Sequence, residues 1–302
     1  MPHPRVTLGP VELASPLVAA AGTVGSVVEF AEVVDFSLYG AAVAKSVAPE
    51  PWEGRQAPRI APTDAGMLNG IGIQNPGIDA WATQVAPQFA AIPTPVWGSI
   101  VAHDIDGFAE VAAKMATTGV AAIEINLSCP NLAGRPFALD ADLTARVVAS
   151  VRAATDLPLG AKLSPDAMPI TPVADAAMSA GADWLVVANT VMGAAIDPET
   201  RRPLLSGLVG GYSGSAVRPI TMRCVLTVAQ DLPDAPIVAC GGVSEASHVV
   251  EYILAGADAV AIGTAHFASP RVAHKIAKNL AMYMAKHSIP TLTELKGAYE
   301  PW

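Results

Sequence analysis

The segment Val120-Ala-Ala-Ile-Glu-Ile-Asn-Leu-Ser-Cys-Pro-Asn131 combines a strand signal with a group of reactive side chains. Its first eight residues are mostly apolar and partly β-branched, which is typical of a buried strand. Proline lacks a backbone N–H, so Pro130 cannot extend a sheet and the predicted strand stops at Cys129. A buried strand that ends in amide, hydroxyl and thiol groups predicts a functional site at its carboxyl end.

Cys129 is the one side chain near this strand end that can exchange a proton near neutral pH. Asn126 and Asn131 flank the thiol with amide donors and acceptors suited to an imide or a carboxylate ligand. A buried structural cysteine is the alternative, because free cysteines usually pack as small apolar residues. The segment alone leaves both interpretations open.

The composition favours one large α/β domain over residues 1–302. The chain has 302 residues, of which 52% are hydrophobic and 15% charged, which is ample material for one core. A formal net charge of −9 argues against nucleic acid or an anionic membrane as a partner. The first residues lack the pattern of a secretion signal, and no apolar run is long enough to cross a bilayer. We therefore expect a soluble protein.

The cysteines and histidines indicate no metal site. Cys129, Cys224 and Cys240 lie far apart and form no Cys-x-x-Cys pair, whereas zinc sites and iron–sulfur clusters need closely spaced thiolates. The six histidines form no ligand-spaced cluster. This cysteine usage suits a reducing cytoplasm.

Strand and helix signals alternate along the chain. Eight apolar strand candidates lie at about 16–21, 41–46, 95–101, 121–127, 158–163, 183–189, 236–240 and 259–263. Alanine-rich helix candidates lie at about 27–36, 78–90, 105–117, 140–154, 169–180, 215–230, 245–255 and 270–286. Continuous apolar strands indicate burial on both faces, and eight such units predict an α/β fold of the (β/α)₈ (TIM) barrel type.

Three segments depart from this alternation. Residues 5–13 alternate about a Gly-Pro turn, which predicts an N-terminal hairpin over the bottom of the barrel. Two long connections, 47–77 and 191–214, follow the second and sixth strands. Long loops at the carboxyl ends of barrel strands usually build the active site, so we expect it there.

Glycines end the last two predicted strands. Gly241 and Gly242 follow the seventh strand, and Gly263 and Thr264 follow the eighth. Backbone N–H groups at such positions approach an anion beside a helix N-terminus, the usual phosphate site of these barrels. Either glycine motif alone is equally typical of a turn, but together they predict a phosphate site.

Lys45 and Lys162 end two otherwise apolar strands. A lysine buried in the mouth of a barrel needs an anion, which is either a ligand or a carboxylate of some neighbouring loop. Asn189 and Thr190 end the sixth strand, and Asn69 lies in the first long loop. Polar groups from several strands are therefore expected to meet at one rim.

The other unusual residues are expected to be structural. A helix-capping or surface role is expected for His103 and His266, which follow the third and eighth strands. Core positions are expected for Cys224, Cys240, Trp97 and Trp184.

With these motifs placed, the chain resembles the class 1 dihydroorotate dehydrogenases from about residue 5 to residue 268. The matching motifs are Met67-Leu-Asn-Gly-Ile-Gly-Ile-Gln-Asn-Pro-Gly77, Asn126-Leu-Ser-Cys-Pro-Asn131, Lys162-Leu-Ser-Pro165, Asn189-Thr190 and Gly241-Gly242. The second insertion, from Ala195 to Pro219, resembles the B type, which uses NAD through a partner, more than the fumarate-using A type.

The resemblance implies an FMN enzyme that oxidises (S)-dihydroorotate to orotate in pyrimidine synthesis. It implies that Cys129 removes the proton from carbon 5 of the substrate while a hydride leaves carbon 6. Its implied substrate-binding residues are Lys45, Asn69, Gly70, Ile71, Gly72, Ile73, Asn126, Asn131, Asn189 and Thr190. Its implied FMN-binding residues are Ala21, Lys45, Ser46, Ser99, Asn126, Lys162, Ala188, Gly214, Gly241, Gly242, Gly263 and Thr264.

Two positions depart from the family pattern near the expected flavin. Ala21 stands where the family commonly has a serine, and Ser99 where it commonly has an asparagine. Each change removes or shortens a polar contact, so FMN affinity is less firmly predicted than the fold.

The B-type resemblance also implies partners. It implies a homodimer that joins an electron-transfer subunit carrying FAD and a [2Fe-2S] cluster in a heterotetramer. Two other functions compete with this reading: a dihydropyrimidine dehydrogenase-like subunit acting on uracil or thymine, and a non-catalytic FMN- or phosphate-binding barrel. Asn131 argues against the first, since that family tends to carry a histidine there, and retention of Cys129 argues against the second.

Overall fold

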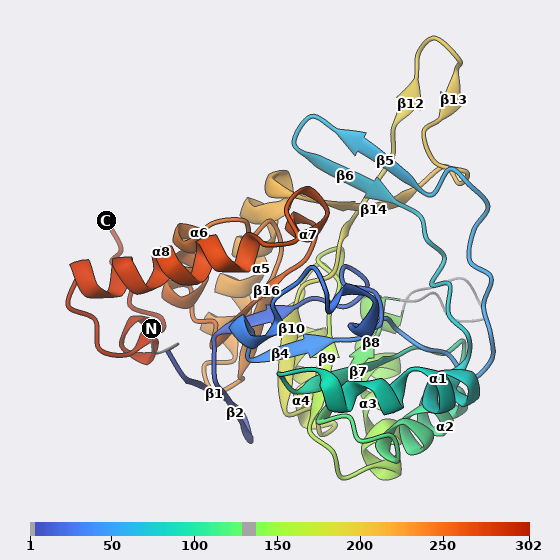
Figure 1. The fold of residues 1–302 in the computed structure, drawn as a ribbon, viewed down its shortest axis with the longest axis horizontal. Coiled ribbons are helices and arrows are strands. Elements are labelled where there is room, and N and C mark those ends of the chain that lie inside the picture. Colours follow the sequence, from blue (N-terminus) through green and yellow to red (C-terminus); the bar gives the residue numbers. More distant parts are fainter. Residues whose placement is uncertain (1–3, 129–136) are drawn as a thin grey trace.

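The computed structural model, which describes residues 4–128 and 137–302, contains a closed barrel of parallel strands in the order β10-β15-β16-β3-β4-β7-β8-β9 (Figure 1). The strands are β3 (Leu17–Ala19), β4 (Ala41–Val43), β7 (Val96–Ile100), β8 (Ala122–Asn126), β9 (Leu159–Lys162), β10 (Trp184–Val187), β15 (Ile237–Cys240) and β16 (Ala259–Ile262). Each falls on a predicted apolar run, so the expected (β/α)₈ barrel is confirmed.

Helices cover the outside of this barrel. They are α1 (Ile78–Gln84), α2 (Ile105–Ala116), α3 (Ala141–Ala154), α4 (Thr171–Ser179), α5 (Arg218–Asp231), α6 (Ala246–Leu254), α7 (Ala265–Ala268) and α8 (Val272–Lys286). Their starts follow the usual signals: the Asp104 and Asp140 carboxylates accept from the backbone of the first turns of α2 and α3. The short α7 was not expected from the sequence.

The helix predicted at 27–36 is wrong. The segment instead contains two 3₁₀ turns, η1 (Val28–Phe30) and η2 (Phe36–Leu38). Val27 has a φ of 77°, outside the helical region, and the Asp35 carboxylate accepts from Ser37 N at 3.1 Å, which starts a separate turn. Val27, Val34 and Phe36 are buried as anchors of an irregular loop, whereas Val33 is exposed, so the apolar spacing only imitates a helix.

The predicted helix at 78–90 is divided in the structure. The α-helix α1 ends at Gln84, and a 3₁₀ helix, η3 (Ala86–Ala91), continues the segment. Pro87 lies in the first turn of η3. Proline has no backbone N–H, so it cannot donate the hydrogen bond that would continue α1.

The N-terminal hairpin is present and lies at the amino ends of the barrel strands. It consists of β1 (Val6–Leu8) and β2 (Val11–Leu13), paired antiparallel. Gly9, at its turn, has a φ of 54° and would place a Cβ 2.7 Å from the Asp183 carbonyl oxygen, just before β10. The hairpin therefore packs against the bottom of the barrel, as predicted.

The two predicted long connections after β4 and β10 contain strands of their own, which the sequence did not indicate. They form a four-stranded antiparallel sheet in the order β11-β14-β6-β5. Its strands are β5 (Ile60–Thr63), β6 (Gly66–Asn69), β11 (Val191–Gly193) and β14 (Gly210–Ser213). Figure 1 shows this sheet projecting from the barrel, with the hairpin of β12 (Ile196–Asp197) and β13 (Arg202–Pro203) at its tip.

The inside of the barrel has two chemically different layers. In the lower layer, Trp97 and Trp184 are fully buried, and their ring centroids lie 4.9 Å apart, as their predicted core role requires. On β7, Ser99 lies two residues beyond Trp97 on the same face, and it pairs in register with the buried Glu124 of β8. The polar layer therefore faces the carboxyl rim.

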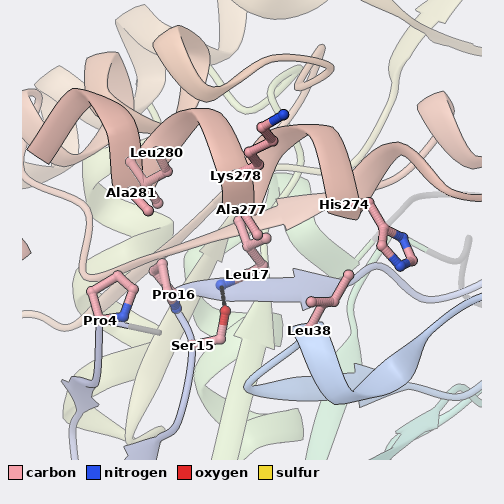
Figure 2. Close-up of a pocket in the computed structure, with 10 residues that line it drawn as sticks. All are labelled: Pro4, Ser15, Pro16, Leu17, Leu38, His274, Ala277, Lys278, Leu280 and Ala281. Carbon is pink, nitrogen blue, oxygen red and sulfur yellow. Dashed lines mark hydrogen bonds between the residues drawn. The ribbon is translucent and has the colours of Figure 1, made fainter. Parts of the chain in front are cut away.

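A pocket of about 210 Å³ lies between α8 and the outer side of β3 (Figure 2). It is lined by α8, by Leu38 of η2, and by Ser15 to Leu17 at the amino end of β3. Since the predicted site residues lie at the carboxyl ends of the strands, this pocket is separate from them. Within the described residues, no helix is both long enough and apolar enough to cross a membrane.

Candidate active site

Three strands bring a buried polar cluster together at the rim. Ser46 Oγ, after β4, lies 2.9 Å from Ser99 Oγ of β7 and accepts from Asn126 Nδ2 of β8 at 3.3 Å. Ser46 and Ser99 are buried. Because buried polar groups are costly unless they are bonded, this cluster has a purpose other than packing.

Asn189 extends the cluster to the next strand. Its Nδ2 donates to Asn126 Oδ1 at 3.3 Å and to Ser128 Oγ at 2.9 Å. Its Oδ1 accepts from the Thr190 backbone N–H at 2.7 Å. Ser128 N in turn donates to Asn126 Oδ1 at 3.3 Å. The side chains predicted on separate strands are therefore one hydrogen-bonded network.

The two insertions meet this network at Asn69 and Thr190. Asn69 Nδ2 donates to the Gly211 carbonyl at 3.1 Å, within the pairing of β6 and β14. A Cβ at Gly211 would lie 2.2 Å from Thr190 Oγ1 and 3.2 Å from Asn69 Nδ2. Only glycine fits between them, so the absence of a side chain at Gly211 allows both polar groups to approach.

The loop from Gly70 to Ile73 is fixed by contacts from the first insertion. The Ile71 carbonyl accepts from Arg55 N at 3.0 Å, and a Cβ at Gly72 would lie 2.6 Å from that same nitrogen. A Cβ at Gly70 would lie 3.0 Å from Arg55 Nη1. Arg55, which the sequence analysis did not single out, therefore shapes this loop.

Ile73 holds a strained backbone at the end of the same loop. Its φ is 52°, a conformation that costs a β-branched residue about 1–3 kcal/mol. Asn75 stabilises it: its Nδ2 donates to the Ile73 carbonyl at 2.8 Å, and its Oδ1 accepts from Ala48 N at 3.1 Å. Such strain is typical of functional sites, and here it is maintained by a buried asparagine.

Lys162 pairs with a strand carboxylate rather than with a loop carboxylate. Its Nζ lies 3.5 Å from Glu124 Oε1, and the two side chains are 7% and 3% exposed. Burial opposes the charge of Lys162, but the attraction of Glu124, with a smaller effect of Cys240, outweighs it and raises the lysine pKa. Lys162 therefore stays cationic.

Cys240 is half-buried at the end of β15 rather than enclosed in the core, whereas Cys224 is buried as predicted. Burial raises the pKa of the Cys240 thiol, Lys162 partly offsets this, and Glu124 adds to it. The thiol is therefore protonated near neutral pH.

Lys45 follows β4 on the same rim. Its backbone N–H donates to the Gly25 carbonyl at 3.0 Å, and its side chain runs past Gly22, where a Cβ would lie 3.6 Å from Lys45 Cδ. The expected cofactor residues Ala21 and Ala188 also follow barrel strands: Ala21 follows β3, which pairs with β4, and the buried Ala188 follows β10, on the opposite side of the ring.

The two glycine motifs lie on the other side of the rim. In the closed ring of eight strands, β15 is opposite β7, and β16 is opposite β8. Gly241 and Gly242 follow β15, and Gly263 and Thr264 follow β16, whose residues pair with those of β15. A ligand that contacts both the glycines and the Asn126 network must therefore extend across the barrel mouth.

The backbone excludes a side chain at Gly242 but not at Gly263. Gly242 has a φ of 67°, and a Cβ there would lie 2.6 Å from Arg218 Cβ and 3.0 Å from the Gly214 carbonyl oxygen. Gly214, with a φ of 107°, thus lies beside Gly242. At Gly263 a Cβ would meet only ordinary contacts, at 3.7 Å.

His266 is not at the surface, which corrects the expectation. It is 1% exposed, and its Nε2 and Nδ1 lie 2.7 Å from Tyr39 OH and 3.2 Å from Thr23 Oγ1. Thr23 donates its proton to the Ala20 carbonyl, so Nδ1 is the donor and Nε2 accepts from Tyr39. Burial lowers the pKa of His266 to about 4. His103, in contrast, is exposed and stacks on Trp52.

Two predicted site residues, Cys129 and Asn131, lie outside the described residues. Ser128, directly before Cys129, is described and is bonded to Asn189. Within the described residues, no group of three or more His, Cys, Asp or Glu side chains could hold a metal ion.

The sequence analysis missed Glu124, Ser128 and Asn75. A signal for Glu124 was available, since a charged residue two positions before Asn126 in an apolar strand must face the same side. Asn75 could not be found, because its role depends on the folded position of Ile73.

The fold and this polar rim define a barrel oxidoreductase: the chain belongs to the dihydroorotate dehydrogenase family, whose model matches residues 5–284. Within the family, its relatives include proteins named "dihydroorotate dehydrogenase B (NAD(+)), catalytic subunit". The one from Alkaliphilus metalliredigens is 40% identical over 97% of this chain and 98% of its own length. The one from Trichlorobacter lovleyi is 41% identical over 99% of each.

A solved structure supports the fold. The chain is similar to a DHODH from Eimeria tenella in complex with ferulenol, with a TM-score of 0.82 and 21% identity, over 98% of this chain and 88% of that one. The resemblance to B-type enzymes that the motifs indicated is confirmed by the curated relatives.

Proposed function

We propose that this chain is an FMN-dependent dihydroorotate dehydrogenase that oxidises (S)-dihydroorotate to orotate in pyrimidine synthesis. The observation that carries the proposal is the continuous network from Ser99 through Asn126 and Asn189 to Thr190. It offers amide and hydroxyl groups to a flat imide ring, at the rim where barrel enzymes bind substrates.

The residues of the rim fit FMN. The cofactor is long, with a phosphate at one end and a flat polar ring at the other. The glycines after β15 and β16 lie opposite the buried polar cluster of β7 and β8. Gly242 is held in a conformation that excludes a side chain, which suits the close approach of a phosphate to the backbone. Lys162 places a cation in the polar layer, where it would stabilise a reduced, anionic flavin.

We assign the individual roles from the family resemblance, and this arrangement is compatible with them. Gly241, Gly242, Gly263 and Thr264 would bind the phosphate, and Ser46, Ser99, Asn126 and Lys162 would contact the ring. Asn69, Asn189 and Thr190 would hold the substrate, with the fixed loop from Gly70 to Ile73 beside it. FMN bound there would supply the acceptor for the hydride that leaves carbon 6.

Cys129 is the proposed base that removes the proton from carbon 5, and Asn131 binds the substrate beside it. Asn189 holds Ser128, the residue before Cys129, at 2.9 Å. An ordinary thiol has a pKa of about 8.5, so only a few per cent is ionised at pH 7, and the rate should rise with pH unless the site lowers that pKa.

The electron acceptor is NAD, reached through a partner. The relatives are named catalytic subunits of an NAD(+) enzyme. The three cysteines of this chain lie far apart in the sequence and do not suit an iron–sulfur cluster. We therefore propose a homodimer of one-domain chains that joins a subunit carrying FAD and [2Fe-2S] as a heterotetramer in the cytoplasm.

The test is to purify the chain, record its visible spectrum, and add dihydroorotate without oxygen. The proposal predicts a flavin spectrum that bleaches, and bleaching slowed by about 10²–10⁴-fold in Cys129→Ala, the usual contribution of a general base. Cys224→Ala, at a buried cysteine away from the rim, is the matched control.

The outcomes separate the alternatives. A flavoprotein that dihydroorotate does not bleach, but that uracil or thymine reoxidises after reduction, would be a dihydropyrimidine dehydrogenase-like subunit. A flavoprotein that dihydroorotate does not bleach and that uracil or thymine does not reoxidise would be a binding barrel. A protein that takes up no FMN would contradict the proposal that FMN is its cofactor.

A further inference from the structure

We propose that Glu124 is a positioning residue of this site: its carboxylate holds the Lys162 ammonium in the polar layer beneath the FMN ring and balances its charge. The expected effect on the flavin rests on the proposed function. The expected effect of Glu124 on Lys162 and Cys240 does not depend on it. Neither the family resemblance nor the sequence motifs assigned a role to Glu124.

The sheet register places Glu124 inside the barrel. It pairs with Ser99 of β7 on one side and with Gly160 of β9 on the other. Ser99 belongs to the buried polar cluster, and Gly160 lies against the indole of Trp184, where a Cβ would be 2.3 Å from Nε1. Glu124 therefore stands between the apolar lower layer and the polar rim.

Lys162 reaches the same place from the neighbouring strand. It pairs with Asn126, two residues beyond Glu124 on the same face of β8. Its side chain is directed to Glu124, with 3.5 Å between Nζ and Oε1. The lysine that faces the proposed flavin is thus oriented by a carboxylate of the same polar layer that lies two residues further from the rim on β8.

Stability does not explain this pair. Taking two charges out of water costs several kcal/mol per ion, and a well-packed apolar pair of the same volume is often at least as stable. Replacing only one partner, in contrast, leaves an uncompensated charge. The pair is better explained by the need for a fixed cation at the rim than by its contribution to folding.

Cys240 is a natural reporter of this charge. Among the described residues, Glu124 of β8 and Cys240 at the end of β15 are the titratable groups whose charges raise the pKa of Lys162. Tyr252 of α6 lies on the outer side of β15, where its hydroxyl donates to the Gly241 carbonyl at 2.7 Å. Because Glu124 disfavours the Cys240 thiolate, removing its charge must make the thiol easier to ionise.

The first arm of the test uses the FMN-free full chain. Cys240 is alkylated with iodoacetamide at pH 7, where Lys162 keeps its charge, and its peptide is followed by mass spectrometry in wild type and Glu124→Gln. We expect a severalfold faster alkylation of Cys240 in the variant. Glu124→Asp, which retains the charge, should react at nearly the wild-type rate. An unchanged rate in Glu124→Gln overturns the proposal.

The second arm uses the FMN-loaded chain and measures the flavin midpoint potential between pH 6 and 9. Without Glu124, the unbalanced Lys162 cation should favour the reduced flavin about tenfold near pH 6, which is about 30 mV for a two-electron couple. Lys162 loses the partner that raises its pKa, so this difference from wild type should shrink as the pH rises. A difference that is absent, or that does not vary with pH, contradicts the inference.

Asp183→Asn is the matched control, because it removes the carboxylate of another ion pair, with Arg152, at the amino end of β10. It should change neither Cys240 alkylation nor the potential, and an equal shift in this control overturns the proposal.

If Glu124→Gln does not fold, the double variant Glu124→Gln/Lys162→Met, with a neutral pair, replaces it. There Cys240 alkylation should return towards the wild-type rate, and the potential should fall below wild type at every pH; failure of either contradicts the proposal. If the wild type takes up no FMN, the proposed function fails, while the alkylation arm still decides the role of Glu124.

Discussion

The two layers inside the barrel lie on the same strands, two residues apart, yet they have opposite chemistry. On β7, Trp97 belongs to the lower layer and Ser99 to the upper one; β9 likewise passes from Gly160 to Lys162. The lower layer is filled by two indole rings whose centroids lie 4.9 Å apart. The upper layer contains a buried ion pair and a chain of hydroxyl and amide groups.

The difference separates stability from function along the barrel axis. The lower layer gains free energy by burying large apolar side chains, whereas the upper layer must offset the cost of buried polar groups by bonding them to one another or to a ligand. Changes in the lower layer should therefore affect folding more than ligand binding, and changes in the upper layer should do the opposite.

The largest expected effect is in the lower layer. Trp184→Ala should lower the free energy of unfolding by about 3–5 kcal/mol, because it leaves a large cavity beside Trp97. Denaturant unfolding measures this loss. Trp184→Phe is the control: the Trp184 indole N–H is buried without a hydrogen-bond partner among the described residues, so the loss should be much smaller. A similar loss in both variants would contradict the packing role of the lower layer.

The free energy of unfolding should fall by about 3 kcal/mol as the pH drops, because His266, beside the glycine motifs, is buried in its neutral form. His266 has a pKa of about 4 in the folded chain, below the ordinary 6.5, so the unfolded chain binds its proton more readily. Stability from this group is complete above pH 6.5 and falls as the pH drops towards 4. The difference between wild type and His266→Gln, measured by denaturant unfolding at pH 7 and 4.5, should isolate this loss; a pH-independent difference would contradict it.

In the upper layer, Asn189→Ala should weaken transition-state binding by about 1–3 kcal/mol. Asn189→Ala removes donors to Asn126 and Ser128, so kcat/KM for dihydroorotate should fall about 10–100-fold, while unfolding changes by about 1 kcal/mol or less. Asn279→Ala, at an exposed position on α8, should change neither. A loss of stability without a loss of activity would assign Asn189 to the fold instead.

The smallest effects distinguish the two glycine positions. Gly242→Ala should cost at least about 1–2 kcal/mol of stability, because of its left-handed φ and the 2.6 Å approach of its Cβ to Arg218 Cβ, and should weaken FMN binding as well. Gly263→Ala meets only contacts at 3.7 Å, so it should leave stability unchanged and weaken FMN binding alone. Titration of both FMN-free variants with FMN measures the affinity. Wild-type affinity in Gly263→Ala would contradict the assignment of Gly263 to the phosphate site.

The sequence predicted the barrel well, because strands buried on both faces read as continuous apolar runs. It failed at 27–36, where Val27, Val34 and Phe36 are buried by tertiary contacts and only imitate a helical pattern. It also missed the sheet of β5, β6, β11 and β14, because these short strands come from insertions more than a hundred residues apart, and local patterns do not report such pairing.

The site was predicted unevenly for a similar reason. Residues at strand ends, such as Asn126 and Asn189, were found because the carboxyl ends of barrel strands must meet at one rim. Partners that exist only in the folded chain were missed or misplaced: Glu124 for Lys162, and Tyr39 for His266. Their identities depend on register and on side-chain direction, which the linear pattern does not contain.

The most direct test of the central claim is a crystal structure of the chain with FMN and orotate. The account predicts the phosphate against Gly241, Gly242, Gly263 and Thr264, the ring across the mouth to Asn126 and Lys162, and orotate bonded to Asn69, Asn189 and Thr190. Orotate bound away from this network, or FMN with its phosphate on another part of the rim, would contradict it.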